Sequence, residues 1–305
     1  MCAFQYRFFQ PAQAAQLRRM EVTVRGVVEG VFAGLHKSPH KGFSIEFAEH
    51  REYVPGDEIK HLDWTVLGKT DRYYIKQYEQ ETNLRATICL DASASMRFGA
   101  VAAGANRPAA VSKFEYAAVL AASLAYLLST QQDLVGLIAF DDAIRLEIPQ
   151  GNGPAHLDRI FVSLEKLSPG RRTDVSGTLH LLANKIARRG LVILISDLFE
   201  DLEKLTTALE HLRHARHQVV LIHVLDRGEI ELDYSTPVMF QDMEDGSRLQ
   251  IDPKLIRTEY RREVQAFLDL LKLKCGQARI DYIPAFTDVP WDAQIREMLR
   301  RTGRR

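Results

Sequence analysis

Residues Ala86–Ser95 have the sequence ATICLDASAS, a short apolar run followed directly by an aspartate and two serines. An apolar run that ends in polar residues is typical of a buried strand in a parallel sheet. Ligands bind at the carboxyl ends of such strands, so Asp91, Ser93 and Ser95 occupy a position where a binding site is expected. This stretch therefore predicts both the class of fold and the place of a functional site.

The chain after residue 84 repeats this alternation of apolar runs and helical segments. Four further buried strands are predicted at 135–140, 191–195, 219–224 and, from a weaker pattern, 279–283. Helices are predicted near 113–129, 155–167, 176–188, 202–214, 254–273 and 291–301. The alternation predicts an α/β fold with a doubly wound, mostly parallel sheet that is covered on both faces. Residues 143–148 follow the preceding strand after a two-residue turn, so we expect them to pair antiparallel at an edge.

The segment before the sheet has a different pattern. Apolar residues spaced by three and four predict a helix from about 17 to 31, and residues 34–71 are rich in turn residues, which favours ordered loop with short extended pieces. A strand is expected at 73–78. We therefore divide the chain into a smaller N-terminal region, residues 1–83, and a sheet domain, residues 84–305. Within that domain, Asp245-Gly246 predicts a hairpin in the otherwise irregular stretch 228–251.

The composition restricts the classes of function. The chain has 305 residues with 40 basic and 40 acidic side chains, so its formal net charge is zero. Such a chain is not expected to bind nucleic acid or anionic membranes through bulk charge. No apolar run reaches the roughly 20 residues of a membrane span, and the N-terminus lacks the pattern of a secretory signal. Three dispersed cysteines fit neither a disulfide framework nor a zinc site, so a cytoplasmic location is expected.

Two further oxygen-bearing residues are expected at the same edge of the sheet. Thr173 lies in a loop before a predicted helix, and Asp197 follows LVILIS, the most apolar strand of the chain. With Asp91, Ser93 and Ser95 they supply hydroxyl and carboxylate oxygens, which suit Mg²⁺ best, or else Mn²⁺ or Ca²⁺. The alternative interpretation is structural, because aspartate and serine also favour turns and helix caps.

The order DxSxS, Thr, Asp resembles the metal-ion-dependent adhesion site of von Willebrand factor A domains. The stretches GFSIEF (42–47), REYVPGDEIKHLDW (51–64) and KQYEQE (76–81) further resemble the bacterial and archaeal family called domain of unknown function 58. The PGDEIKHLDW part either packs the N-terminal region onto the sheet domain or offers a surface to a partner.

The resemblance has implications for fold, site and function. It implies a von Willebrand A-like, Rossmann-like sheet domain with metal ligands at the positions that match the motif. Ser93 and Ser95 would bind the metal directly, Asp91 and Asp197 through water, and Thr173 in either way. The resemblance also implies a non-enzymatic adaptor that accompanies a MoxR-type AAA+ ATPase in assembling or activating a protein complex.

A physical mechanism follows from the expected ligands. A cation held mainly by hydroxyl groups stays electrophilic and keeps a replaceable water, so an acidic residue of a partner protein can complete its coordination. The alternative is a metal-assisted hydrolase that uses the same site, but no His or Glu stands next to a site loop to act as a base. Nearby, Arg171 and Arg172 could steer an acidic partner, and Asp174 either caps the next helix or supports a ligand.

Overall fold

The computed structural model describes residues 6–10, 13, 45–54, 64–70, 72–80, 84–99, 111–170, 174–186, 188–234, 236–242 and 246–302. The chain divides into two compact units. One unit comprises Met1–Val31 with Leu84–Arg305, and the other comprises Phe32–Asn83. Among the described residues, no helix is long and apolar enough to cross a membrane.

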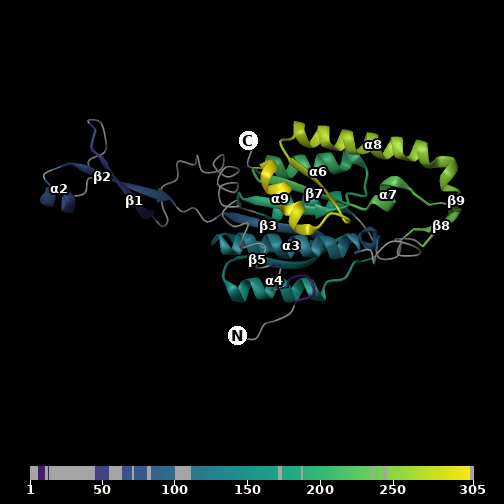
Figure 1. The fold of residues 1–305 in the computed structure, drawn as a ribbon, viewed down its shortest axis with the longest axis horizontal. Coiled ribbons are helices and arrows are strands. Elements are labelled where there is room, and N and C mark those ends of the chain that lie inside the picture. The colour runs from purple at the N-terminus through teal and green to yellow at the C-terminus, as the bar shows by residue number, and fades with distance from the viewer. Residues whose placement is uncertain are drawn as a thin grey trace. The chain divides into compact units, whose positions relative to one another are not determined.

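A six-stranded sheet forms the centre of the larger unit (Figure 1). Its strands are β3 (Arg85–Asp91), β4 (Leu134–Phe140), β5 (Ile144–Gly151), β6 (Leu191–Ser196), β7 (Gln218–Leu225) and β10 (Asp281–Phe286). Their order across the sheet is β10-β7-β6-β3-β4-β5, with β5 antiparallel to β4 and the other pairs parallel. Numbered along the chain this is 3-2-1-4-5-6, the order of a doubly wound fold. The predicted α/β class and the antiparallel edge strand are confirmed.

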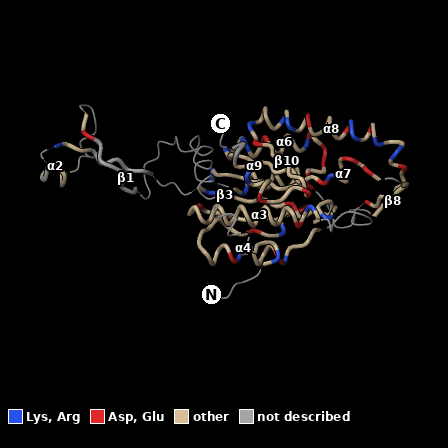
Figure 2. The backbone as a smooth tube through the Cα atoms, viewed as in Figure 1, with Lys and Arg blue, Asp and Glu red and all other residues tan. Residues whose placement is uncertain are grey.

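Helices cover both faces of this sheet. They are α3 (Lys113–Thr130), α4 (Pro154–Lys166), α5 (Val175–Lys185), α6 (Leu202–His214), α8 (Pro253–Gln277) and α9 (Trp291–Thr302). Helices α5, α6 and α8 are neighbours in one layer, and α3 contacts α4 and α9 in the other (Figure 1). Basic and acidic residues both occur along α4 and α8 (Figure 2). These six helices match the six that the sequence predicts.

The burial of the central strands explains why their sequences are so apolar. All six residues of β6 are buried, and Ile88 and Leu90 of β3 expose no surface. A strand covered on both faces buries every side chain, so its sequence is a continuous apolar run and not an alternating one. Each such side chain contributes about 1.5–3 kcal/mol to folding through burial.

Helix α3 begins at a capping box that places Lys113 in its first position. The hydroxyl of Ser112 accepts a hydrogen bond from the backbone N of Glu115 at 3.2 Å, and the Glu115 carboxylate accepts one from the backbone N of Ser112 at 3.1 Å. The Lys113 side chain enters the interior, where 2% of it is exposed. The local capping signal thus fixes where a buried ammonium group enters the domain.

Aromatic residues near the N-terminus pack on the sheet unit. The ring of Phe9 stacks on Phe161 of α4 with centroids 4.6 Å apart, and it lies 4.9 Å from the ring of Tyr126 of α3. Phe8 meets Phe114 of α3 edge to face. The described part of Met1–Val31 therefore belongs with the sheet, although the sequence pattern grouped it with residues 32–83.

The smaller unit is built on a two-stranded antiparallel sheet. Strand β1 (Ile45–Glu52) pairs with β2 (Tyr74–Gln80), which confirms the strand expected at 73–78. Helix α2 (Trp64–Thr70) corrects the prediction of loop with extended pieces across 34–71. Seven residues span less than two turns, which is too short to show a helical period. The helix expected at 17–31 and residues 55–63 of the PGDEIKHLDW part lie outside the described residues.

Small elements connect β7 to α8. Helix α7 (Arg227–Glu231) begins at Asp226, whose carboxylate accepts a hydrogen bond from the backbone N of Gly228 at 2.7 Å. Strands β8 (Val238–Gln241) and β9 (Arg248–Ile251) then form an antiparallel hairpin. The hairpin predicted in this stretch is confirmed, whereas α7 falls in a part that we predicted to be irregular.

Candidate metal centre

Asp91 ends β3 at the carboxyl edge of the sheet, and hydrogen bonds engage both of its carboxylate oxygens. Its Oδ1 accepts from the backbone N of Ser93 at 2.8 Å, and its Oδ2 accepts from the hydroxyl of Ser196 at 2.5 Å. Burial, reinforced by the charge of Asp197, raises the pKa of Asp91 to about 7 although these hydrogen bonds act to lower it. A carboxylate that already accepts two hydrogen bonds is suited to hold a metal-bound water.

The hydroxyl groups of Ser93 and Ser95 lie side by side, with their oxygens 3.0 Å apart. Ser93 is fully buried and Ser95 is partly exposed. The 3₁₀ turn η2 (Ala94–Arg97) starts after Ser93 and brings Ser95 back toward it. Two adjacent ligands of an octahedral Mg²⁺ with bonds of about 2.1 Å are also about 3.0 Å apart. The separation of the two hydroxyl oxygens therefore fits neighbouring positions around one cation.

Asp197 follows β6 and is paired with a lysine that the sequence analysis did not single out. The Nζ atom of Lys113 donates to Oδ2 of Asp197 at 2.7 Å and to Oε1 of Glu229 at 2.6 Å. The side chains of Lys113 and Asp197 are 2% and 3% exposed, and that of Glu229 is 31% exposed. One carboxylate of the candidate centre is thus already bound to a cation that belongs to the protein.

Burial and charge act against each other in this cluster. Burial acts to raise the pKa of Asp197, but the charge and hydrogen bond of Lys113, with a hydrogen bond from Ser95, lower it overall. Burial acts to lower the pKa of Lys113, but its two carboxylate partners raise it overall. For Glu229 burial prevails and raises the pKa to about 7. Lys113 and Asp197 therefore form an ion pair at neutral pH.

The side chain of His223, on β7, forms a hydrogen bond with the backbone carbonyl of Asp197. Its Nε2 lies 2.9 Å from the carbonyl oxygen of Asp197, and its Nδ1 lies 2.9 Å from the hydroxyl of Tyr282. Burial lowers the pKa of His223 to about 4, so the ring is neutral at pH 7. Since a carbonyl only accepts, Nε2 carries the proton and Nδ1 accepts from Tyr282. The histidine orients this strand end without adding charge to it.

The loop that leads to Thr173 is anchored beside the end of β3. The backbone N of Gly170 donates to the carbonyl of Ala92 at 2.6 Å, and Ala92 is the residue that follows Asp91. The guanidinium of Arg97 donates to the carbonyl of Gly170 at 3.0 Å. These contacts bring residue 170 next to the predicted ligands.

Thr173 itself, with Arg171 and Arg172, lies outside the described residues. The next residue, Asp174, caps α5, because its Oδ1 accepts from the backbone N of Gly177 at 2.8 Å. The helix cap predicted as one of two roles for Asp174 is confirmed.

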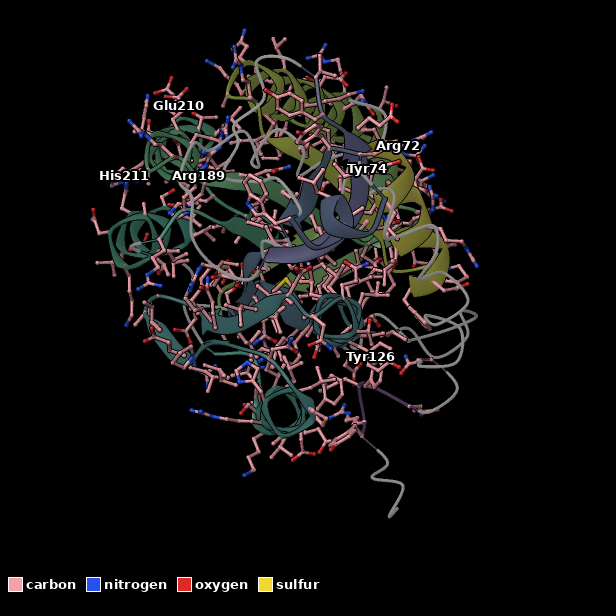
Figure 3. All side chains as sticks on the ribbon, turned by 90° about the vertical axis from the view of Figure 1, so that its left-hand side faces the viewer. Arg72, Tyr74, Tyr126, Arg189, Glu210 and His211 are labelled. Carbon is pink, nitrogen blue, oxygen red and sulfur yellow. The ribbon has the colours of Figure 1, made fainter. Side chains whose placement is uncertain are left out.

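The structure gathers four of the five predicted ligands, all except Thr173, at the carboxyl edge of the sheet. Figure 3 shows the molecule from the end that is opposite to this edge of the sheet. Arg189, Glu210 and His211, which are labelled there, lie toward that opposite end. Within the described residues, no three His, Cys, Asp or Glu side chains are arranged to hold a metal. The candidate centre instead combines two hydroxyls with two carboxylates.

Several residues of the site were missed from sequence. The Ser-x-x-Glu pattern at 112–115 marks a helix start and would have placed Lys113 near the strand ends. Glu229 and His223 carry no such local signal, because their roles depend on contacts with distant residues. They also place a glutamate and a histidine near the candidate centre, where the sequence offered no neighbouring base.

This chain is similar to a protein family and to several proteins of known sequence or structure. A family profile described as "Protein of unknown function DUF58" matches residues 49–267. An uncharacterized protein of Mycobacterium tuberculosis is 30% identical over 263 residues, which are 84% of this chain and 79% of that protein. The BatB structure from Bacteroides thetaiotaomicron is 17% identical and covers 73% of this chain and 100% of its own, with a TM-score of 0.45. The SpRpn10 VWA domain is 11% identical and covers 71% and 95%, with a TM-score of 0.39.

Proposed function

Because this chain belongs to the DUF58 family of proteins of unknown function, we propose that it is a non-enzymatic adaptor that binds a partner protein through a divalent cation. In this proposal Mg²⁺ binds Ser93 and Ser95 directly and Asp91 and Asp197 through water, with Thr173 as the fifth contributor. In the same proposal, Mn²⁺ or Ca²⁺ can take the place of Mg²⁺ at this site. An acidic side chain of the partner completes the coordination. The proposed partner system contains a MoxR-type AAA+ ATPase and acts in the cytoplasm.

The observation that carries the proposal is the 3.0 Å separation of the Ser93 and Ser95 hydroxyl oxygens. It equals the distance of about 3.0 Å between adjacent ligands of an octahedral Mg²⁺. The doubly hydrogen-bonded Asp91 is poised beside this pair to orient a metal-bound water. Hydroxyl oxygens carry no formal charge, so they leave the bound cation strongly electrophilic.

The charge around the centre also favours an acidic partner. When a cation is bound, both aspartates are ionised and Glu229, whose pKa burial raises to about 7, is protonated, Asp91 and Asp197 supply two negative charges and Lys113 supplies one positive charge. A divalent cation therefore outweighs the remaining single negative charge. The excess attracts a carboxylate from outside the chain, as a metal-dependent latch requires.

A pull-down in four conditions tests this proposal. Wild type and Ser93→Ala are each mixed with a purified MoxR-type ATPase from the same genome, in Mg²⁺ or in EDTA. We expect recovery of the ATPase only with wild type in Mg²⁺. Ser163→Ala, which removes a hydroxyl from α4 on the surface of the same domain, is the matched control and should behave as wild type. Equal recovery in all four conditions would contradict the latch.

The alternative, a metal-assisted hydrolase, gains one candidate base from the fold. Glu229, whose pKa burial raises to about 7, lies near the centre. Its Oε1, however, already accepts a hydrogen bond from the Lys113 ammonium at 2.6 Å, which leaves only Oε2 to take a proton from water. Turnover of phosphate or peptide substrates that is lost in Asp91→Ala would support the hydrolase and overturn the adaptor.

A further inference from the structure

A cavity of about 480 Å³ lies beside the candidate metal centre. Its walls come from the ends of β6 and β7, from α7 and from the middle of α8. Lys113 and Asp197 line the cavity as well, so it shares one side with the candidate centre. Most of its lining is apolar, as expected of a pocket that binds a ligand or a partner side chain.

One wall of the cavity is an apolar stripe of α8 that is only partly covered by the part of the chain that the structure describes. Toward the end of the helix, Leu271 and Cys275 are buried in the core. One and two turns earlier, the same face continues as Val264, Phe267 and Leu268, which are only partly buried and line the cavity. A helix face with this spacing normally packs against another element along its length. In this helix, the part of the apolar face that Val264, Phe267 and Leu268 form borders the cavity.

A tight turn supplies another wall of the cavity. Leu198 has a positive φ of 53° and is fully buried, and its carbonyl accepts a hydrogen bond from the backbone N of Glu200 at 2.8 Å. A leucine in the left-handed region is uncommon and costs conformational energy. The turn leaves the ring of Phe199 74% exposed, although this ring also lines the cavity. An exposed aromatic ring beside an apolar cavity is typical of a binding surface.

The charges around the cavity are mostly negative. Four carboxylates line it, those of Asp197, Glu200, Glu229 and Glu263, against the single ammonium of Lys113. Lys113 is already bound by Asp197 and Glu229. This leaves Glu200 and Glu263 to attract basic groups, although the side chain of Arg262 lies 3.3 Å from Glu263 at the exposed surface.

We propose that this cavity binds a short basic and apolar segment of a partner protein, whose apolar side chain packs against Val264 and Phe267 while a lysine or arginine pairs with Glu200. The charge complementarity selects a basic segment over an acidic one. The apolar wall supplies the affinity, since a buried apolar anchor carries most of the binding energy in such interfaces. Binding at this site needs no cation, so it does not depend on the proposed metal latch, although Asp197 borders both sites.

Two synthetic peptides test the proposal with the full chain. Both carry leucines at the same helical spacing, and their polar positions are all lysine in one peptide and all glutamate in the other. Binding is measured by fluorescence anisotropy in EDTA. We expect the lysine peptide to bind at least about tenfold more tightly than the glutamate peptide, a difference of about 1.4 kcal/mol. Ser93→Ala should bind it as wild type does, which separates this site from the latch.

Matched substitutions on α8 locate the binding. Val264→Gln is expected to weaken binding of the lysine peptide at least about tenfold, because the substitution places an amide in the apolar wall. Leu255→Gln also replaces an apolar residue of α8 by glutamine, but at a position that is 83% exposed and outside the cavity lining, and it should leave binding unchanged. Glu200→Gln, which keeps an oxygen to accept the hydrogen bond from the backbone N of Ser176, should weaken binding by a smaller factor.

Other outcomes would overturn the proposal. These are equal binding of the two peptides, failure of the lysine peptide to bind a wild-type chain that melts cooperatively, or an equal loss in Leu255→Gln and Val264→Gln. Self-association of wild type that Val264→Gln abolishes, measured by analytical ultracentrifugation, would identify a second copy as the occupant and would also overturn it.

Discussion

The Nζ atom of Lys113 lies 2.7 Å from Oδ2 of Asp197, and both side chains are almost completely buried. These residues are far apart in the sequence, and the second follows the strand next to β3. The ion pair therefore lies beside the two serines that the sequence predicts as metal ligands. It places a fixed positive charge at the edge of a candidate cation site.

Replacing Lys113 by methionine should destabilise the domain strongly. The substitution removes the ammonium group that pairs with both Asp197 and Glu229, and a buried ion pair that loses one partner costs about 3–5 kcal/mol. The free energy of unfolding, measured in urea, checks this. Lys185→Met is the control, because Lys185 pairs with Glu147 at the surface and its loss should cost less than about 1 kcal/mol. A similar small loss in both variants would show that the buried pair is not stabilising.

Direct metal binding should depend on the two serines. We expect Ser93→Ala and Ser95→Ala each to weaken Mn²⁺ binding about 10–100-fold, as measured by isothermal titration calorimetry. Each variant removes one oxygen of the pair that lies 3.0 Å apart. Unchanged Mn²⁺ affinity in both variants would mean that the serines are not ligands.

The contribution of Asp133 to stability should fall as the pH rises from about 4 to about 7. Burial raises the pKa of Asp133 to about 7, although a hydrogen bond from the backbone N of Leu84 opposes the shift. The unfolded chain has the ordinary value of about 3.9, so the folded state holds the proton more tightly and loses this stabilisation as the pH rises.

Asp133→Asn isolates that contribution. Asparagine keeps an oxygen that can accept from Leu84 and cannot ionise, so the variant should match wild type near pH 4, below which Asp133 is largely protonated in both the folded and the unfolded chain. At pH 8 it should be more stable by roughly 1–3 kcal/mol in urea denaturation. Asp269→Asn, at the exposed face of α8, should leave the pH dependence unchanged. A wild-type difference between pH 4 and pH 8 that persists fully in Asp133→Asn would contradict this prediction.

Gly170→Ala should disturb the loop beside the candidate centre. A Cβ atom there would lie 2.1 Å from Oδ2 of Asp141, too close for any real contact, so either the loop or the Asp141 carboxylate, which lies 3.4 Å from Nε of Arg145, must shift. We expect a lower melting temperature and weaker Mn²⁺ binding. Gly276→Ala in α8 should have the opposite effect on stability, because nothing lies within 4 Å of the added atom and alanine favours a helix by about 0.8–1 kcal/mol over glycine. Equal melting temperatures for the two variants would refute the steric argument.

The sequence predicted the sheet well because the signals of its elements are local. The continuous apolar run of β6 follows from burial on both faces, and the alternation of runs with helical segments predicted the doubly wound fold. Helix α2 was missed because seven residues do not establish a period. Helix α7 was missed for the same reason, as it has five residues.

What the sequence by itself determined was the order of the strands along the chain and the polar residues that end them. Asp91, Ser93, Ser95 and Asp197 could be assigned to one edge because parallel strands end on the same side of a sheet. Only the tertiary structure decided that Lys113 neutralises Asp197 and that α8 leaves part of its apolar face open over a cavity. Ion pairs and cavities depend on distances between segments that are remote in the chain, and no local pattern encodes those distances.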